Sequence, residues 1–424
     1  MKKIALCLAL VSLLALGGQA IAVQCTIDAV PAATLLLPYF QVDLDNPNGL
    51  TTLFSVNNAS ATAVLAHVVL WGDWTVPVLD FDIYLTGYDV QTINLRDIIV
   101  LGNLPETASD GQDPADTISP QGDFSQDINF ASCSGILPYS NPALNASFLA
   151  HLQAALTGNL SALLGGYAGE NFGDNIARGY ITVDTVNACN LLFPGDAGYF
   201  GDGGTGFATN QNVLWGDWFY VNSDNNFAQG DTLVHVEAFS SVQSGAWAPG
   251  DYTFYGRYVA ATAIDNREPL GTNFAVRYIN GGAFDGGTDL ICWRDSKIVS
   301  PSSGWTIAGP TWWPLGQGQI VIFDEQENPE TPDECQVSPC PPGEFVVPCR
   351  NETNLTLVDG PDFPISFDFG WLFLNLNTTT GGFFDPDAQA WVGAIYSAEG
   401  RYSIGLNAIQ LDSACAASHV AIGG

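Results

Sequence analysis

The chain has 424 residues, with 44 acidic against 11 basic side chains, and its formal net charge at pH 7 is −33. This negative charge repels nucleic acids and anionic lipid headgroups, so we expect neither as a partner. Glycine (45 residues), proline (24 residues) and aromatic residues (12%) surround many short apolar runs, which predicts a mainly β protein.

The first 22 residues have the pattern of a secretory signal peptide. Lys2 and Lys3 precede an apolar core at residues 4–16, and the small residues Ala20 and Ala22 predict cleavage after Ala22. The apolar core is too short to span a bilayer, and no later run of about 18 apolar residues offers a transmembrane span. We therefore expect an exported chain, secreted, periplasmic or at the cell surface, with no transmembrane segment.

Residues 23–135 are predicted to form a first β-sandwich that ends in an exposed acidic loop. Residues 65–71 and 79–85 both alternate with period two, and the second run places polar side chains, among them Asp82, on one face. It is therefore predicted to be a half-buried antiparallel strand. Short strands separated by turn residues, such as Asn-Pro-Asn-Gly at 46–49, favour an immunoglobulin-like sandwich.

Residues 136–250 are predicted to form a middle region with one helix and several strands. Asn141 is the expected N-cap and Pro142 the first helical residue of this helix. Apolar side chains recur at three- and four-residue spacing over 144–156, as one face of a helix requires. Runs rich in β-branched residues follow the helix and predict strands.

Residues 251–424 are predicted to form a second immunoglobulin-like sandwich, with a connection rich in cysteine and proline. The run Leu-Thr-Thr-Leu-Phe-Ser-Val at 50–56 is similar to Leu-Gly-Thr-Asn-Phe-Ala-Val at 270–276, and the two runs are followed by Trp-x-Asp at Trp71 and Trp293 respectively. Each run and its Trp-x-Asp are predicted to belong to a hairpin of two adjacent strands. The two sandwiches would then be distant duplicates of each other.

The hexapeptide Val-Leu-Trp-Gly-Asp-Trp occurs twice, at 69–74 and at 213–218. The flanks of the two copies disagree, so the second copy is interpreted as a separate use of one strand ending. In this ending, tryptophan covers the sandwich edge, glycine permits a bulge and aspartate bonds turn amides. We therefore expect Trp71 and Trp293, but not Trp215, to occupy equivalent strands.

The chain has nine cysteines, and eight remain once the signal segment is removed. An even number in an exported chain favours disulfides, although the sequence leaves their connectivity open. The alternative is a metal site at the clustered cysteines of 335–349, but their spacing forms no paired C-x-x-C motif and no histidine is nearby. The cysteines expected in disulfides are Cys25, Cys133, Cys189, Cys292, Cys335, Cys340, Cys349 and Cys415.

Aspartate-rich turns raise the alternative of a structural calcium site. None of these turns matches the EF-hand pattern, and aspartate is also common in turns that bind no ion. No cofactor is required, and calcium is the one optional ion that the sequence suggests. The candidate ligands are Asp43, Asp45, Asn222, Asp224 and Asn226.

Catalytic signatures are absent from the sequence, which has no G-x-S-x-G, H-E-x-x-H, P-loop or dinucleotide-binding motif. His67 and His235 lie in apolar strand runs and are interpreted as packed residues. Trp305, Trp312 and Trp313 lie in a segment rich in glycine and proline, where exposed rings would stack on sugars. The alternative is that these rings close the open end of a sandwich.

These patterns favour a non-catalytic exported β-sandwich protein that serves a surface, matrix or scaffold role, with cell-surface or matrix components or glycans as partners. The alternative is a carbohydrate-active protein, either a glycan-binding module or a glycosidase. The segments Pro31–Phe40, Thr51–Asn58 and Tyr88–Asp97 resemble a group of secreted bacterial hypothetical proteins with no assigned activity. That resemblance implies a compartment and no mechanism.

Overall fold

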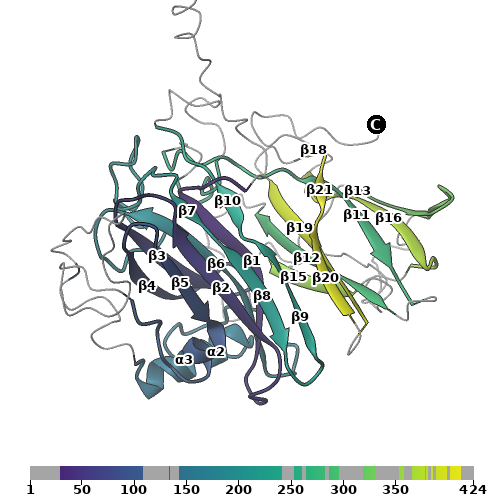
Figure 1. The fold of residues 1–424 in the computed structure, drawn as a ribbon, viewed down its shortest axis with the longest axis horizontal. Coiled ribbons are helices and arrows are strands. Elements are labelled where there is room, and N and C mark those ends of the chain that lie inside the picture. The colour runs from purple at the N-terminus through teal and green to yellow at the C-terminus, as the bar shows by residue number, and fades with distance from the viewer. Residues whose placement is uncertain are drawn as a thin grey trace, which may run out of the picture.

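The chain folds into antiparallel β-sheets that form two sandwiches, as a computed structural model shows (Figure 1). The mainly β class predicted from the sequence is confirmed. Within the part of the chain that is described, no helix is long and apolar enough to cross a membrane. The structure describes residues 29–107, 133, 143–240, 253–259, 264–281, 286–295, 319–330, 353–357, 365–377, 379–380, 383–384, 388–398 and 402–411.

The first sandwich contains a five-stranded sheet in the order β10-β1-β6-β3-β4, and every neighbouring pair in it is antiparallel. Strand β3 is buried along its whole length, because both faces of this sheet are covered. The strands of the sheet are β1 (Thr34–Asp43), β3 (Val64–Trp71), β4 (Pro77–Leu85), β6 (Ile176–Val186) and β10 (Val234–Val236).

The facing sheet has the order β5-β2-β8-β9, and the short strand β7 also pairs with β2. Phe54, Trp218 and Tyr220 are buried in the apolar core that this sheet shares with the first one. The strands of this sheet are β2 (Thr51–Asn58), β5 (Val90–Asn94), β7 (Leu214–Trp215), β8 (Asp217–Asn222) and β9 (Phe227–Thr232).

The strands expected in a separate middle region complete the first sandwich. Strand β6 lies between β1 and β3, while β8 and β9 extend the facing sheet. Strands β1, β2 and β3 therefore each have a hydrogen-bonding partner among the strands of 176–236. Period-two patterns show that a strand exists, but they do not show which distant strand pairs with it.

Strand β4 is buried on both faces, so the prediction that it is half-buried is wrong. Asp82, on the supposedly solvated face, has 2% of its surface exposed. Irregular chain at 187–210 covers this outer face of the sheet, and the rings of Tyr199 and Phe207 pack there against His67. A polar strand face can therefore be an interior face when a loop covers it.

Both described helices belong to the first sandwich and lie close together (Figure 1). Helix α3 (Ala146–Leu156) is the predicted helix, but its N-cap is Asn145, whose side chain accepts a backbone N–H at 2.9 Å. The expected cap, Asn141, lies outside the described residues. The shorter helix α2 (Leu95–Ile99) was not predicted, and it begins at the N-cap Asn94.

The second sandwich consists of the sheets β14-β13-β16-β11-β21 and β15-β12-β19-β20, with a separate two-stranded ribbon of β17 and β18. Its own core includes Phe274, Leu372 and Val392. Its strands are β11 (Asn273–Ile279), β12 (Gly287–Asp295), β13 (Gln319–Asp324), β14 (Pro329–Glu330), β15 (Thr353–Leu357), β16 (Phe369–Asn375), β17 (Thr379–Thr380), β18 (Phe383–Phe384), β19 (Gln389–Ala398), β20 (Tyr402–Asn407) and β21 (Ile409–Gln410).

The two sandwiches share a pattern of strand pairing. Strand β3 lies between β4 and β6, and β12 lies between β15 and β19; β2 pairs with β5 and β8, and β11 pairs with β16 and β21. Trp71 and Trp293 therefore lie near the ends of corresponding strands, as predicted. Trp215 lies on the short strand β7, outside this correspondence.

The predicted hairpins are wrong in both sandwiches. Strands β2 and β3 lie in different sheets, and so do β11 and β12. The chain therefore passes from one sheet to the other between β2 and β3, and again between β11 and β12. Alternating side chains are equally compatible with a hairpin and with such a crossing, so the sequence pattern did not distinguish them.

The two sandwiches are in direct contact. Strand β9 of the first runs beside β20 of the second (Figure 1), and Ser403 Oγ donates a hydrogen bond of 2.6 Å to the carbonyl of Ala228. Trp293 and Trp391, from the second sandwich, belong to the apolar core of the first. The cores are thus joined by buried aromatic side chains.

Candidate functional site

The outward surface of the sheet β5-β2-β8-β9 exposes two aromatic rings. Trp215 and Phe219 are 42% and 46% exposed, whereas Trp218 and Tyr220 are 2% exposed each and point into the core. Period-two geometry places Trp215, Asp217 and Phe219 on the same side of the sheet. We call the outward residues Trp215, Asp217, Phe219, Ser55, Asn57 and Val90 the aromatic face.

Cross-strand pairing fixes the layout of the aromatic face. Asn57 on β2 lies opposite Val90 on β5 and Trp215 on β7, so that the polar residue is flanked by two apolar ones. Phe219 lies opposite Leu53 on the same strand β2. Directly opposed residues share one side of a sheet, so the residues at Trp215 form one row across the sheet and those at Phe219 form another, with Ser55 and Asp217 between the two rows.

A hydrogen-bonded polar chain lies between the two rings. Asn57 Nδ2 donates to Ser55 Oγ at 2.9 Å, and Ser55 Oγ donates to Asp217 Oδ1 at 2.6 Å. The Asn57 side chain is buried, and its Oδ1 accepts no hydrogen bond within the described residues. An unpartnered buried carbonyl oxygen is costly, so it marks a place where a donor would be favourable.

Two glycines let the rings lie close to the backbone. A Cβ at Gly230 would come within 2.7 Å of Phe219 Cδ1, so the Phe219 ring rests against the backbone of β9. A Cβ at Gly216 would come within 2.2 Å of the Ser55 carbonyl oxygen, so the strand joins β2 tightly between Trp215 and Asp217. The aromatic face is therefore held by the sheet itself rather than by a loop.

A row of polar residues crosses the other sheet and is fully buried. Asp82, His67, Asp184 and Thr34 lie opposite one another on β4, β3, β6 and β1. Irregular chain covers this row on the outer side of the sheet, as described above for β4. Cross-strand register therefore brings two carboxylates to opposite sides of one histidine.

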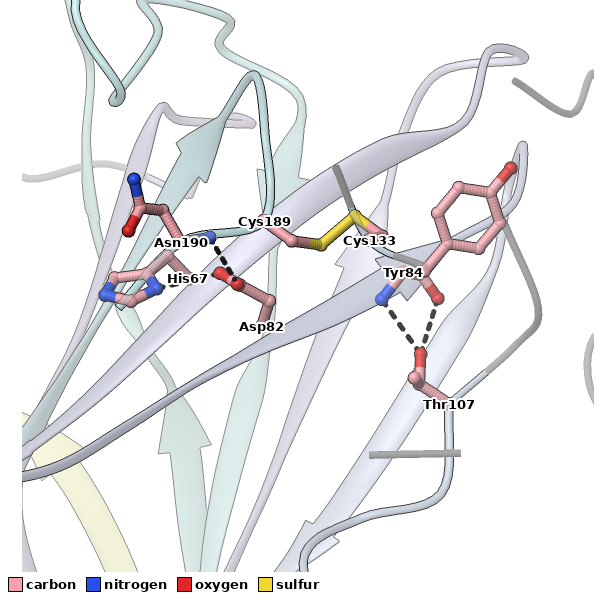
Figure 2. Close-up of a disulfide and its surroundings, with 7 residues drawn as sticks. All are labelled: His67, Asp82, Tyr84, Thr107, Cys133, Cys189 and Asn190. Carbon is pink, nitrogen blue, oxygen red and sulfur yellow. Dashed lines mark hydrogen bonds and ion pairs between the residues drawn. A yellow bond between two sulfur atoms is a disulfide. The ribbon is translucent and has the colours of Figure 1, made fainter. Parts of the chain in front are cut away.

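His67 is held by Asp82 at a hydrogen-bonding distance of 2.8 Å from its Nδ1 (Figure 2). The second carboxylate oxygen of Asp82 accepts the backbone N–H of Asn190 at 3.0 Å, next to the disulfide between Cys133 and Cys189. The disulfide thus anchors the covering segment at the point where it bonds the carboxylate.

Burial and charge both act on this cluster. Burial disfavours the charged form of His67, but the hydrogen bond to Asp82 and the nearby carboxylates outweigh it and raise its pKa. Burial also raises the pKa of Asp80 to about 6, although His67 favours its carboxylate form. His67 Nε2 lies 3.8 Å from Asp80 Oδ2, and neither atom has a hydrogen-bond partner within the described residues.

Asp184 is the centre of a second buried network. Its carboxylate accepts hydrogen bonds from Thr34, from the Tyr199 hydroxyl at 2.7 Å and from the Tyr255 hydroxyl at 2.9 Å. Arg267, whose Nε lies 3.5 Å from Asp184 Oδ1, neutralises this charge. The network joins the covering segments to β6, and it satisfies its buried charges in the way that a structural element requires.

The remaining described histidines are also buried. His151 Nδ1 lies 2.6 Å from Ser161 Oγ and its Nε2 lies 3.0 Å from the Val78 carbonyl oxygen, while burial lowers its pKa. His235 Nε2 accepts the backbone N–H of Gly216 at 3.4 Å. In the described part of the chain, histidines therefore serve packing and hydrogen bonding rather than an open acid–base site.

The candidate calcium turns lie side by side. Asn46 Nδ2, in the β1–β2 turn, donates to Asp224 Oδ2, in the β8–β9 turn, at 2.8 Å. Asp43 Oδ1 accepts two backbone N–H groups of its own turn, and Asp45 Oδ1 accepts from the Asn175 side chain. These side-chain oxygens of Asp43, Asp45 and Asp224 therefore already accept hydrogen bonds within the turns or from neighbouring segments.

The other two candidate ligands lie in the β8–β9 turn. Asn222 Oδ1 accepts the backbone N–H of Asn225 at 3.3 Å, and Asn226 adopts the left-handed conformation with φ of 49°. Among the described residues, no three histidine, cysteine or carboxylate side chains gather as a metal site. Calcium binding stays a prediction, which melting with calcium and with a chelator tests.

The other predicted site residues are only partly described. Trp305, Trp312 and Trp313 lie outside the described residues. Cys292 is disulfide-bonded, as are Cys133 and Cys189, and the partner of Cys292 lies outside the described residues. The cysteines outside the described residues are Cys25, Cys335, Cys340, Cys349 and Cys415.

Sequence reasoning missed the aromatic face. The second hexapeptide was interpreted as a strand ending, and β7 does end at Trp215, but Trp215 is 42% exposed whereas Trp71 is 1% exposed. The available signal was the sequence Trp-Gly-Asp-Trp-Phe at 215–219, whose alternation places one aromatic set outward and another inward.

Comparisons of the chain with protein-family models, with curated proteins and with solved structures find no match. Only the residues of the chain itself therefore bear on its function.

Proposed function

We propose that this chain is an exported, non-catalytic β-sandwich protein that serves a surface, matrix or scaffold role by binding through the aromatic face. The observation that carries this proposal is the outward pair Trp215 and Phe219, which flank Asp217 on a rigid sheet. Exposed aromatic rings around a few fixed polar groups are typical of binding surfaces.

The buried polar clusters support a binding role over catalysis. His67 and Asp82 are enclosed by the covering segment, and Asp184 is satisfied by Arg267 and two tyrosines. A general acid or base must reach substrate, and these groups do not reach solvent. The disulfide between Cys133 and Cys189 and the signal-like N-terminus support export.

Retention of the purified chain by its native surroundings tests the proposal. We expect the wild-type chain to sediment with the cells and extracellular matrix of the organism that encodes it. The double variant Trp215→Ala/Phe219→Ala should stay in the supernatant. Phe172→Ala is the matched control, because Phe172 is 44% exposed and lies outside the aromatic face. Equal retention of all three proteins would refute the proposal.

A further inference from the structure

We propose that the aromatic face binds a neutral glycan chain, with Trp215 and Phe219 as stacking surfaces and Asp217 as the central hydroxyl acceptor. This inference rests on the proposed function and names the class of its ligand. It assigns the ligand to residues of the first sandwich, not to the tryptophans at 305–313.

The rings have the placement that a chain of several sugars requires. The positions of Trp215 and Phe219 are four residues apart along one edge of β2, which corresponds to about 13 Å in a strand. One sugar ring does not span this length, so each aromatic side chain would contact a different sugar. The Phe219 ring rests on Gly230, which leaves its other side available to the C–H groups of a sugar.

The polar groups between the rings match sugar hydroxyls. Asp217 is hydrogen-bonded through Oδ1 to Ser55, which orients the carboxylate at the centre of the face. Asn57 Oδ1 is a buried acceptor without a donor within the described residues, in the same row as Trp215. Sugar hydroxyls can donate to the half-buried carboxylate of Asp217, whereas a wholly apolar partner would leave it without that hydrogen bond.

Charge favours a neutral ligand. The chain has a net charge of −33, and the aromatic face itself carries the carboxylate of Asp217 but no lysine or arginine. Sulfated or uronate polymers would be repelled, and so would a second copy of this chain. A neutral glycan has no such penalty, and its binding should depend little on salt.

The size of the face also favours a glycan over a folded protein. Four strands about 4.8 Å apart and about 20 Å long give roughly 400 Å² of surface. A standard protein–protein interface needs about 800 Å² from each partner. A narrow chain that stacks on two rings fits the smaller area.

Calorimetric titration with defined oligosaccharides tests the inference. The probes are hexamers of β-1,4-linked glucose, β-1,3-linked glucose and β-1,4-linked N-acetylglucosamine, with a galacturonate hexamer as the anionic comparison. We expect saturable binding of at least one neutral hexamer, unchanged between 50 and 500 mM salt, and no binding of the galacturonate. The exposed indole of Trp215 should report binding through a change in tryptophan fluorescence.

Variants then assign the contacts. Trp215→Ala and Phe219→Ala should each weaken binding about tenfold or more, which corresponds to about 1.4 kcal/mol. Trp215→Phe should restore part of the affinity, because it keeps an aromatic ring. Asp217→Asn should weaken binding without unfolding the sheet, since asparagine keeps an acceptor for Ser55. Phe172→Ala should bind as the wild type does.

The outcomes separate this inference from the proposed function. Absence of binding to every neutral hexamer, or equal affinity in the Trp215→Ala/Phe219→Ala variant, would overturn the glycan assignment. If retention by the native surface still depended on Trp215 and Phe219, the binding function would stand with another ligand class. If retention were also independent of these residues, both proposals would fail.

Discussion

Trp71 and Trp293 both contact the ring of the same tyrosine, Tyr180. The Trp71 ring is stacked on Tyr180 with centroids 5.7 Å apart, and Trp293 meets Tyr180 edge-to-face at 6.1 Å. Trp71 belongs to the first sandwich and Trp293 to the second. The two tryptophans, one from each sandwich, therefore meet at one residue and join the sandwiches.

We predict that Trp71→Ala destabilises the chain by about 3–5 kcal/mol. The Trp71 ring is buried against Tyr180 and Tyr258, and its Nε1 donates to Thr182 Oγ1 at 2.9 Å. Trp215→Ala should change the free energy of unfolding by less than about 0.5 kcal/mol, because Trp215 is exposed. Denaturant unfolding measures both, and equal effects would contradict the assigned burial of the two hexapeptides.

Trp293→Ala should uncouple the two sandwiches. Trp293 lies on β12 of the second sandwich but stacks on Phe254 at 5.4 Å and meets Tyr180, which both belong to the apolar core of the first, so its removal takes away contacts across the boundary. We expect calorimetry to show two transitions where the wild type shows one. Trp371→Ala is the control, since Trp371 lies on β16 of the second sandwich with Arg277 over its ring. Separate transitions in both variants would contradict the role of Trp293.

The sequence was informative where structure follows from local periodicity. The alternation at 65–71 predicted β3, and spaced apolar residues predicted α3, because a strand or helix face is set by its own residues. The similar runs near Trp71 and Trp293 correctly indicated corresponding strands. Each of these inferences needed only the residues of one short segment.

Long-range contacts escaped prediction. Nothing in the sequence near Asp82 shows that the segment after Cys189 covers it, so a buried charge was interpreted as an exposed one. The crossing from β2 to β3 was missed for the same reason, since one partner of each strand, β8 for β2 and β6 for β3, is more than a hundred residues away in the chain. The exposure of Trp215 likewise depends on which sheet face remains uncovered.

Loss of the disulfide between Cys133 and Cys189 should cost about 2–4 kcal/mol, because it closes a long loop in the unfolded chain. The variant Cys133→Ser/Cys189→Ser should also loosen the segment at Asn190 that bonds Asp82. Denaturant unfolding gives the first effect, and hydrogen exchange at the Asn190 amide gives the second.

Alkylation of the native wild-type chain without reductant should modify no cysteine. Modification of Cys133 or Cys189 would contradict the bond.

Acidification from pH 8 to pH 6 should stabilise the folded chain. The pKa of His67 is raised in the fold, so its stabilising contribution is complete below the unfolded value near 6.5 and is lost as pH rises through the folded pKa. Burial raises the pKa of Asp80 and of Asp265 to about 6. The ionised forms of these carboxyls destabilise the fold, and this destabilisation decreases as pH falls through about 6 and is gone below the unfolded pKa of 3.8. His151, whose pKa is lowered, opposes the trend.

Asp80→Asn removes the Asp80 carboxyl from this pH dependence and also takes away one of the charges that raise the pKa of His67. The variant cannot ionise, so its free energy of unfolding should exceed that of the wild type at pH 8 and approach it near pH 4. Asp80 Oδ2 has no hydrogen-bond partner within the described residues, so little is lost by replacing it. Leu191→Ala, at an exposed and non-titrating position, should keep the wild-type pH profile. Urea unfolding at closely spaced pH values measures these profiles. Two results together would contradict this prediction: the wild type would lose stability steadily from pH 8 to pH 6, and Asp80→Asn would have the same profile. They would show that Asp80 and His67 do not bind protons in the fold at those pH values.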